Sequence, residues 1–174
     1  MPAALRRLHD RGFKGVKLYP SYDHYHFNDT GMYPLYSAAQ ELRLPILVHT
    51  GTSIFKNTRL KYADPIDVDD VAVDFPELTI LLAHAGRMAW YDLAMTLVRL
   101  HRNVYIELSG IAVKKLLDLF PDMERFSHKF VFGTDWPQVD TGKNIAGLRS
   151  LGLSETAQAR ILGGNAARIL GIAA

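Results

Sequence analysis

A chain of 174 residues, 48% of them hydrophobic, is long enough to fold as one domain with a sizeable core. Its 20 basic and 18 acidic residues nearly balance, and basic residues never run longer than a pair, so the composition predicts no nucleic-acid or membrane surface. No apolar run is long enough to span a bilayer and the charged start lacks the apolar core of a signal peptide, so we expect a cytoplasmic location. Because the sequence has no cysteine, any bound metal must use nitrogen and oxygen ligands.

Short apolar runs alternate with longer segments of helical period, which is typical of repeated βα units around a parallel sheet. Residues 2–10 form the first predicted helix, and residues 15–19 form the first strand. A second helix is predicted over residues 32–42. It must end before Pro45, because a proline disfavours helical geometry in the residue ahead of it.

The second half of the chain continues the same pattern. The second strand is predicted at residues 46–48, and Asp64-Pro65 is predicted to start the next helix with a capping carboxylate and a proline in its first turn. The elements predicted after it are a strand over 79–83, a helix over 90–101, a strand over 104–108, short helical pieces over 114–119 and 122–126, a strand over 129–133, a helix from Ser154 and, after a break at Gly163-Gly164-Asn165, a last turn over 166–170. With no low-complexity segment or linker, we expect a single domain over residues 1–174.

Three of the predicted strands end in motifs that carry an imidazole or a carboxylate. They are Val48-His49-Thr50-Gly51, Ala83-His84-Ala85-Gly86 and Gly133-Thr134-Asp135-Trp136-Pro137. Because the carboxyl ends of parallel strands meet at one edge of a sheet, we expect these side chains to converge, and two histidines with an aspartate outline a metal site. A closed eightfold barrel usually takes about 250 residues, so five βα units predict a partial (β/α)8 TIM barrel of about five parallel strands with flanking helices.

At these motifs the sequence resembles the amidohydrolase superfamily, in the amidohydrolase-2 branch that also contains aminocarboxymuconate semialdehyde decarboxylase, resorcylate decarboxylases and dicarboxylate lactonases. Residues 12–20 resemble the fourth barrel strand of that family, 44–51 the fifth, 78–86 the sixth, 133–137 the eighth-strand motif and 161–168 the closing helix. The resemblance implies a C-terminal part of a TIM barrel and a catalytic divalent metal, most simply zinc.

The first barrel strand of the family normally supplies two more metal ligands as His-x-His, and this chain begins after the point where that strand would lie. His24-Tyr25-His26 has the right letters, but it follows the strand of Lys17 in a loop, so we do not give it that role. We therefore expect either a fragment of a longer protein or a half-barrel completed by another subunit. Open edge strands near Lys17 and Phe132 predict self-association, and so a homo-oligomer.

The resemblance implies a role for each strand-end side chain. His49 would bind the metal, where the alternative is a buried histidine satisfied by a backbone carbonyl. His84 would bind the metal, polarise the substrate or shuttle a proton. Asp135 would touch the metal and take a proton from the attacking water, where the alternative is a cap on the loop before Pro137.

Other residues near the strand ends are further candidates for the site. Lys17 stands where some amidohydrolases carry a carboxylated lysine, but its ammonium could equally reach the substrate or a carboxylate. Glu107 is expected in a buried ion pair. The remaining candidates for lining a pocket are Tyr19, Arg59, Arg87 and Trp136. An arginine there indicates a carboxylated small-molecule substrate.

Three functions follow from this reading. The first is a metal-dependent hydrolase that cleaves an ester, lactone or amide with metal-activated water and Asp135 as the base. The second is a non-oxidative decarboxylase at the same site, in which His84 or Asp135 handles the proton. The third is a truncated half-barrel that self-associates without catalytic activity.

Overall fold

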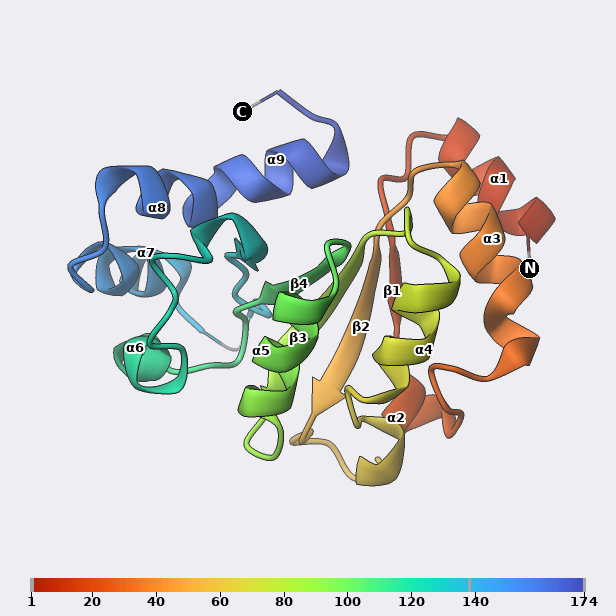
Figure 1. Ribbon diagram of the computed structural model, residues 1–174, viewed down its shortest axis with the longest axis horizontal. Helices are drawn as coiled ribbons and strands as arrows, with labels where there is room; N and C mark the ends of the chain where they lie inside the picture. The colour runs from red at the N-terminus through yellow and green to blue at the C-terminus, as the bar shows by residue number, and fades with distance from the viewer. Residues whose placement is uncertain (1, 138, 174) are drawn as a thin grey trace.

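A computed structural model describes residues 2–137 and 139–173 of the chain (Figure 1). Within these residues, five parallel strands form one sheet in the order β1-β2-β3-β4-β5. The strands are β1 (Val16–Leu18), β2 (Ile46–Gly51), β3 (Ile80–Arg87), β4 (Val104–Glu107) and β5 (Phe130–Val131). Each strand pairs with the next one along the chain, as in a barrel built one βα unit at a time, so the predicted partial barrel with five parallel strands is confirmed.

Helices connect and flank the strands. They are α1 (Pro2–Asp10), α2 (Pro20–Asp23), α3 (Tyr33–Glu41), α4 (Asp67–Asp74), α5 (Tyr91–Leu100), α6 (Leu116–Leu119), α7 (Thr141–Arg149), α8 (Glu155–Ala159) and α9 (Asn165–Leu170). The predicted bounds of α1, α3 and α5 agree with the structure to within one residue. α4 begins later than predicted, because Asp64 caps a separate turn by accepting a hydrogen bond from the backbone N of Ile66 at 2.9 Å.

Four features of the connections differ from the prediction. α2 and α7 were not predicted; α7 has little apolar periodicity, and it begins where the Asp140 side chain accepts a hydrogen bond from the backbone N of Lys143 at 3.0 Å. Residues 122–126, predicted to be helical, form turns. The predicted break at Gly163-Gly164-Asn165 is wrong, because a π-helical turn over Arg160–Gly164 joins α8 to α9.

The two faces of the sheet have different chemistry, because successive side chains of a strand point to opposite faces. The face that packs on the helices is apolar and almost fully buried; it includes Ile46, Val48, Ile80, Leu82, Val104, Ile106 and Phe130. The opposite, inner face carries the polar residues. Its two layers, matched by the strand register, are Lys17, Leu47, Leu81 and Tyr105, and then His49, Ala83, Glu107 and Val131.

α9 lies at the end of the sheet opposite to the carboxyl end of β2 (Figure 1). Its Ala166 and Ile169 pack against the inner-face cluster of Leu81, Tyr105 and Val131. A cavity of about 440 Å³ remains beside this cluster, and its wall is mostly apolar. One end of the inner face is thus covered by α9, and the carboxyl end is left for a functional site.

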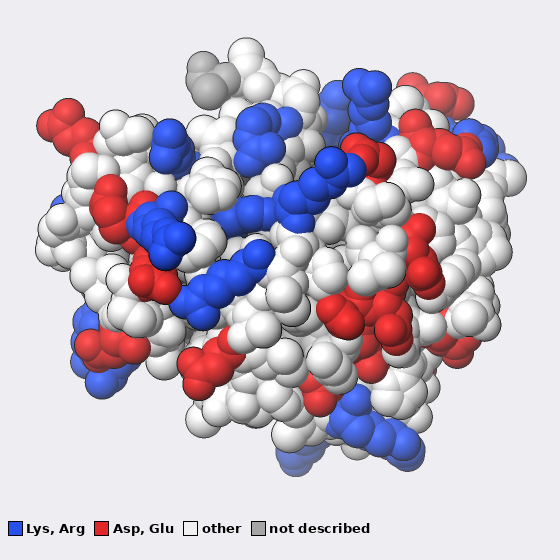
Figure 2. Space-filling model, viewed as in Figure 1, with Lys and Arg blue, Asp and Glu red and all other residues white. Residues whose placement is uncertain are grey.

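The surface of the folded chain carries charges of both signs (Figure 2), as its nearly balanced composition predicts. The face in Figure 2 carries acidic and basic side chains side by side, with a band of Lys and Arg across its upper middle. Among the described residues, no helix has the length and apolar character needed to cross a membrane.

Candidate functional site

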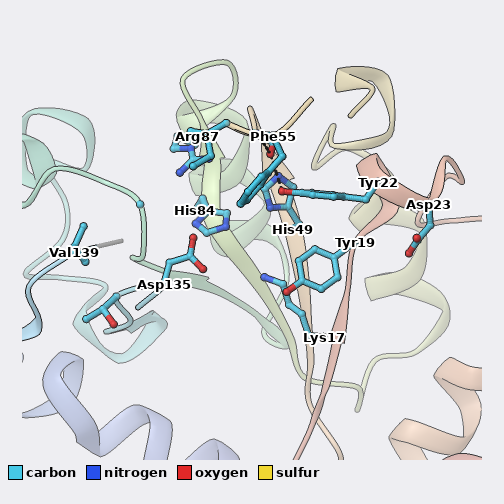
Figure 3. A pocket seen from close by; sticks show the side chains of 14 residues that line it. Lys17, Tyr19, Tyr22, Asp23, His49, Phe55, His84, Arg87, Asp135 and Val139 are labelled. Carbon is cyan, nitrogen blue, oxygen red and sulfur yellow. Dashed lines mark hydrogen bonds between the residues drawn. The ribbon is translucent and has the colours of Figure 1, made fainter. Parts of the chain in front are cut away.

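A cavity of about 570 Å³ opens at the carboxyl end of the sheet (Figure 3). Six of the side chains predicted for the site line it, namely Lys17, Tyr19, His49, His84, Arg87 and Asp135. Residues from β1, β2, β3 and the segment after β5 therefore meet in one place, as parallel strand ends should. Trp136, also predicted, is outside this lining, and its side chain is 77% exposed.

β2 and β3 run further than predicted, so His49 and His84 lie within the last residues of their strands. The register of the two strands shifts between His49 and Gly51, and a side chain at Gly51 would overlap the backbone of Gly86 and Arg87. Thr50 stabilises the irregular pairing at the ends of β2 and β3. Its Oγ1 donates to the carbonyl O of Ala83 and accepts from the backbone N of Gly86, both at 2.8 Å.

Left-handed backbone conformations occur at the candidate residues themselves. The φ angle is 67° at His84, 50° at Ala85 and 54° at Asp135. Non-glycine residues adopt such angles at an energetic cost, and they persist where surrounding structure holds them, often at functional sites. In Figure 3 the Asp135 carboxylate points toward the His84 ring.

His49 is almost fully buried, with 3% of its surface exposed, and its Nε2 has no hydrogen-bond partner among the described residues. Burial, followed by the nearby His84, Lys17 and Arg87, lowers the pKa of His49 to about 3. The imidazole is therefore neutral near pH 7. A buried nitrogen with an unused lone pair is costly to leave unpaired, and a bound ligand would satisfy it.

His84 lies next to His49, with 4.9 Å between the ring centroids. Its Nδ1 donates to the backbone O of Ser109 at 2.8 Å. Burial lowers the pKa of His84 to about 4, although the contact with Ser109 opposes this shift. His84 is thus a second neutral imidazole, and its Nε2 remains available for chemistry in the cavity.

Glu107 points to the same inner face, but the expected ion pair is not seen in the described part of the chain. Its Oε1 accepts from the backbone N of Ser109 at 3.0 Å, and its Oε2 accepts from Ser109 Oγ at 2.7 Å. Burial raises the pKa of Glu107. Gly133 makes room for this carboxylate, because a side chain at that position would overlap Oε1.

Two cations face the cavity. Burial lowers the pKa of Lys17, while Glu107 and Asp135 oppose that effect, and the Lys17 ammonium lies 5.0 Å from the centroid of the Tyr19 ring. Arg87 donates from Nε and Nη2 to the backbone O of Thr52, at 3.2 Å and 2.6 Å, which fixes the guanidinium at the cavity wall. Cationic side chains that line a cavity suit an anionic group on a ligand.

The sequence did not predict the apolar side of the cavity. Tyr22, Ile54 and Phe55 line the cavity, and Tyr22 packs edge-on against His49 with 5.4 Å between the centroids. The Tyr22 hydroxyl forms a 2.7 Å hydrogen bond with Ser53 Oγ, which holds the loop after β2 against α2. Pro20-Ser21, a proline at a helix start, was the available signal for α2 and so for Tyr22.

The remaining candidates stabilise loops. His24 Nε2 is 2.8 Å from the backbone O of Asn57, and His26 Nδ1 is 2.9 Å from Asp67 Oδ2. The backbone N of Arg59 donates to the backbone O of Ser21 at 2.9 Å, and Arg59 does not line the cavity. Neither His24 nor His26 lines the cavity.

The side chains at the cavity are of the kinds that bind metal ions, but too few of them lie close together to form a complete site. Neutral imidazole nitrogens and carboxylates bind divalent metals in proteins, and the buried Nε2 of His49 has no hydrogen-bond partner among the described residues. Within residues 2–137 and 139–173, however, no three His, Asp or Glu side chains stand close enough together to hold an ion. The described residues thus bring together donors of the right kind, without a complete set of ligands.

Comparison with known proteins identifies the family. The family model for amidohydrolases of the amidohydrolase-2 type matches residues 2–172. No curated protein matches the chain by sequence.

Several solved structures share the fold. An uncharacterised TIM-barrel protein from Bordetella bronchiseptica has a TM-score of 0.83 and 24% identity, with 97% of this chain and 61% of that chain covered. A dihydroxybenzoic acid decarboxylase from Polaromonas sp., with bound manganese and the inhibitor 2-nitroresorcinol, has a TM-score of 0.73 and 15% identity, and 98% and 64% are covered. A probable 2-pyrone-4,6-dicarboxylic acid hydrolase from Acinetobacter baumannii, with citric acid bound, has a TM-score of 0.73 and 17% identity, and 99% and 69% are covered. The chain thus spans less than two thirds of the length of the first two.

Proposed function

The chain belongs to the amidohydrolase family, and on that premise we propose that its cavity serves the metal-dependent hydrolysis of an ester, lactone or amide in a carboxylated small molecule. The observation that carries the proposal is the meeting of His49, His84 and Asp135 at one cavity, with both imidazoles neutral. This is the combination of nitrogen and oxygen donors that metal-assisted hydrolysis needs.

His49 and His84 would hold the metal through their Nε2 atoms, and Asp135 is the candidate third ligand. Zinc is our first choice because two histidines and a carboxylate are a usual zinc set. Manganese is the alternative, since a neighbour of the same fold contains it. When bound, the metal supplies a Lewis acid that lowers the pKa of water and polarises a substrate carbonyl.

The side chains of this chain would do the rest of the chemistry. Asp135 would accept the proton of the attacking water, since its carboxylate lines the cavity beside the His84 ring (Figure 3). Lys17 and Arg87 would each offer a positive charge to a carboxylate of the substrate and so orient the bond to be cleaved. Tyr22 and Phe55 pack against the apolar part of the substrate and exclude water from that side.

Non-oxidative decarboxylation at the same site is the second candidate. The cavity is lined by the aromatic rings of Tyr19, Tyr22 and Phe55 as well as by the two cations, a combination that suits a planar aromatic acid. His84 or Asp135 would then deliver a proton to the carbon that loses carbon dioxide. A neighbour of the same fold, a dihydroxybenzoic acid decarboxylase, holds the aromatic inhibitor 2-nitroresorcinol.

Since the donors are short in number, we propose that the metal centre is completed by barrel strands outside this chain or by a second subunit. A chain that never acquires these donors would be an inactive half-barrel, which is the third candidate. The apolar cavity on the inner face, of about 440 Å³, supports association with such a partner.

Metal content tests the proposal directly. The purified chain, His49→Ala and the control His9→Ala, whose imidazole is exposed on α1, are dialysed against Zn²⁺ or Mn²⁺ and then metal-free buffer, and bound metal is measured by mass spectrometry. We expect metal in the wild type and in the control, and loss of it in His49→Ala. Metal absent from all three would rule out a metal centre completed by a second copy of this chain, and it would favour the inactive half-barrel for the chain by itself.

Product analysis then separates the two reactions. The metal-loaded chain is incubated with a dicarboxylated lactone and, separately, with a hydroxylated benzoic acid. Ring-opened acid without carbon dioxide supports hydrolysis, whereas release of carbon dioxide supports decarboxylation and refutes hydrolysis as the main activity.

A further inference from the structure

We propose that Glu107 and Ser109 are positioning residues that hold His84 in one tautomer, with the proton on Nδ1 and the lone pair on Nε2. The proposal rests on the proposed function only for what Nε2 does next, namely binding a metal or moving a proton. The lock itself is built from contacts between the end of β3, the end of β4 and the segment just after β4.

Ser109 stands between the carboxylate and the imidazole and contacts both. Its backbone N and its Oγ donate to the two oxygens of Glu107, at 3.0 Å and 2.7 Å. Its backbone O and its Oγ lie 2.8 Å and 3.0 Å from His84 Nδ1. Glu107, Ser109 and His84 are all buried, with exposed fractions of 7%, 4% and 3%, so water does not compete for these bonds.

The direction of each hydrogen bond follows from the atoms involved. A backbone carbonyl can only accept, so His84 Nδ1 must carry a proton to bond with the Ser109 O. A carboxylate also accepts, so the Ser109 hydroxyl hydrogen is directed at Glu107 Oε2 and the Oγ lone pairs are left for His84. Both acceptors of Ser109 therefore favour a proton on Nδ1, and Nε2 remains as a lone pair.

Close packing leaves this arrangement little freedom. A side chain at Gly133 would overlap Glu107 Oε1, and one at Gly110 would come within 3.1 Å of His84 Nδ1. Neutral histidine outside such a network exchanges between its tautomers, and the second bond on a ligating imidazole is what usually fixes which nitrogen is free.

Glu107→Gln provides a nearly isosteric test. The backbone N of Ser109 is a donor only, so the Gln oxygen must face it, and the Gln NH2 must then face Ser109 Oγ. The hydroxyl now accepts from the amide, and its hydrogen is free to point at His84 Nδ1. The substitution thus reverses the hydrogen bond of the Ser109 hydroxyl. The hydroxyl then favours a His84 tautomer with the proton on Nε2, while the Ser109 carbonyl still favours a proton on Nδ1.

The measurement is 15N NMR of the histidine side chains in the chelator-treated chain, without metal or substrate. His84→Gln identifies the His84 signals among the 7 histidines. We expect a protonated Nδ1 and an unprotonated Nε2 in the wild type, and a shift to a mixture of tautomers in Glu107→Gln. In Ser109→Ala the carbonyl remains, so the wild-type tautomer should persist, and Glu107→Gln/Ser109→Ala should match Ser109→Ala.

Each alternative result is decisive. A wild-type His84 with its proton on Nε2 would overturn the lock, whether or not the variants fold. An unchanged tautomer in folded Glu107→Gln, or a double variant that behaves like Glu107→Gln, would remove Ser109 as the link between Glu107 and His84. Failure of metal binding or turnover refutes the proposed function and leaves the tautomer measurement untouched.

Discussion

Acid should destabilise the fold through the two imidazoles of the site. The pKa is about 3 for His49 and about 4 for His84 in the folded chain, against 6.5 for an ordinary histidine. Both groups are neutral in the folded and the unfolded chain at pH 8, so they contribute no pH dependence there. Below pH 6.5 the unfolded chain takes up protons that the folded chain refuses, and stability falls as pH falls toward the folded pKa values.

The size of the effect follows from the same values. At pH 5 each histidine is mostly protonated when unfolded and neutral when folded, which costs about 2 kcal/mol per residue at 1.36 kcal/mol per pKa unit. Both side chains are only 3% exposed, so solvent screening does little to reduce this cost. Together they should lower the free energy of unfolding by about 4 kcal/mol between pH 8 and pH 5.

The assay is urea unfolding at pH 8, 7, 6 and 5 in the presence of a chelator. His49→Gln/His84→Gln removes both titrating groups, and His9→Gln removes an exposed histidine as the matched control. The wild type and the control should lose about 4 kcal/mol more than the double variant over this range. The raised pKa of Glu107 acts in the opposite direction, because acid relieves its burial, but it is common to all three chains and cancels. Parallel pH profiles for the wild type and the double variant would refute the reasoning.

Two further predictions concern packing and assembly. Gly133→Ala should destabilise the fold by about 1–3 kcal/mol in urea unfolding, because its Cβ would overlap the buried Glu107 carboxylate. The control is Gly163→Ala, which should leave the stability unchanged because a Cβ there meets nothing within 4 Å. Equal stability of the two variants would contradict the placement of Glu107. The chain should self-associate in multi-angle light scattering through the open edges of β1 and β5 and the apolar inner-face cavity. A monomeric mass at every concentration tested would contradict that prediction.

Strand-end motifs made the main lines of the fold and site predictable. Apolar runs bounded by glycine and proline locate strands well, and the common edge of a parallel sheet then brings His49, His84 and Asp135 together whatever their sequence separation. The alternation of side chains along β4 also places Glu107 on the inner face of the sheet, in register with Ala83.

The parts that could not be predicted have a weak sequence signal or depend on particular side-chain contacts. α7 has no clear apolar period and includes two glycines, so its sequence reads as a loop. Tyr22 and Phe55 form a wall only because α2 and the loop after β2 fold against each other. The ion pair expected for Glu107 was wrong because the hydroxyl and amide of Ser109, two residues away, satisfy the carboxylate locally.

The left-handed backbone at His84, Ala85 and Asp135 bears on how this chain would respond to laboratory evolution. Each of these residues costs roughly 1 kcal/mol relative to a glycine that adopts the same angle freely. A library screened for thermal tolerance alone should therefore drift toward glycine at these positions, and the winners would lose the imidazole and the carboxylate. Screening for ligand capture as well would retain both, so the two selections should diverge first at these sites.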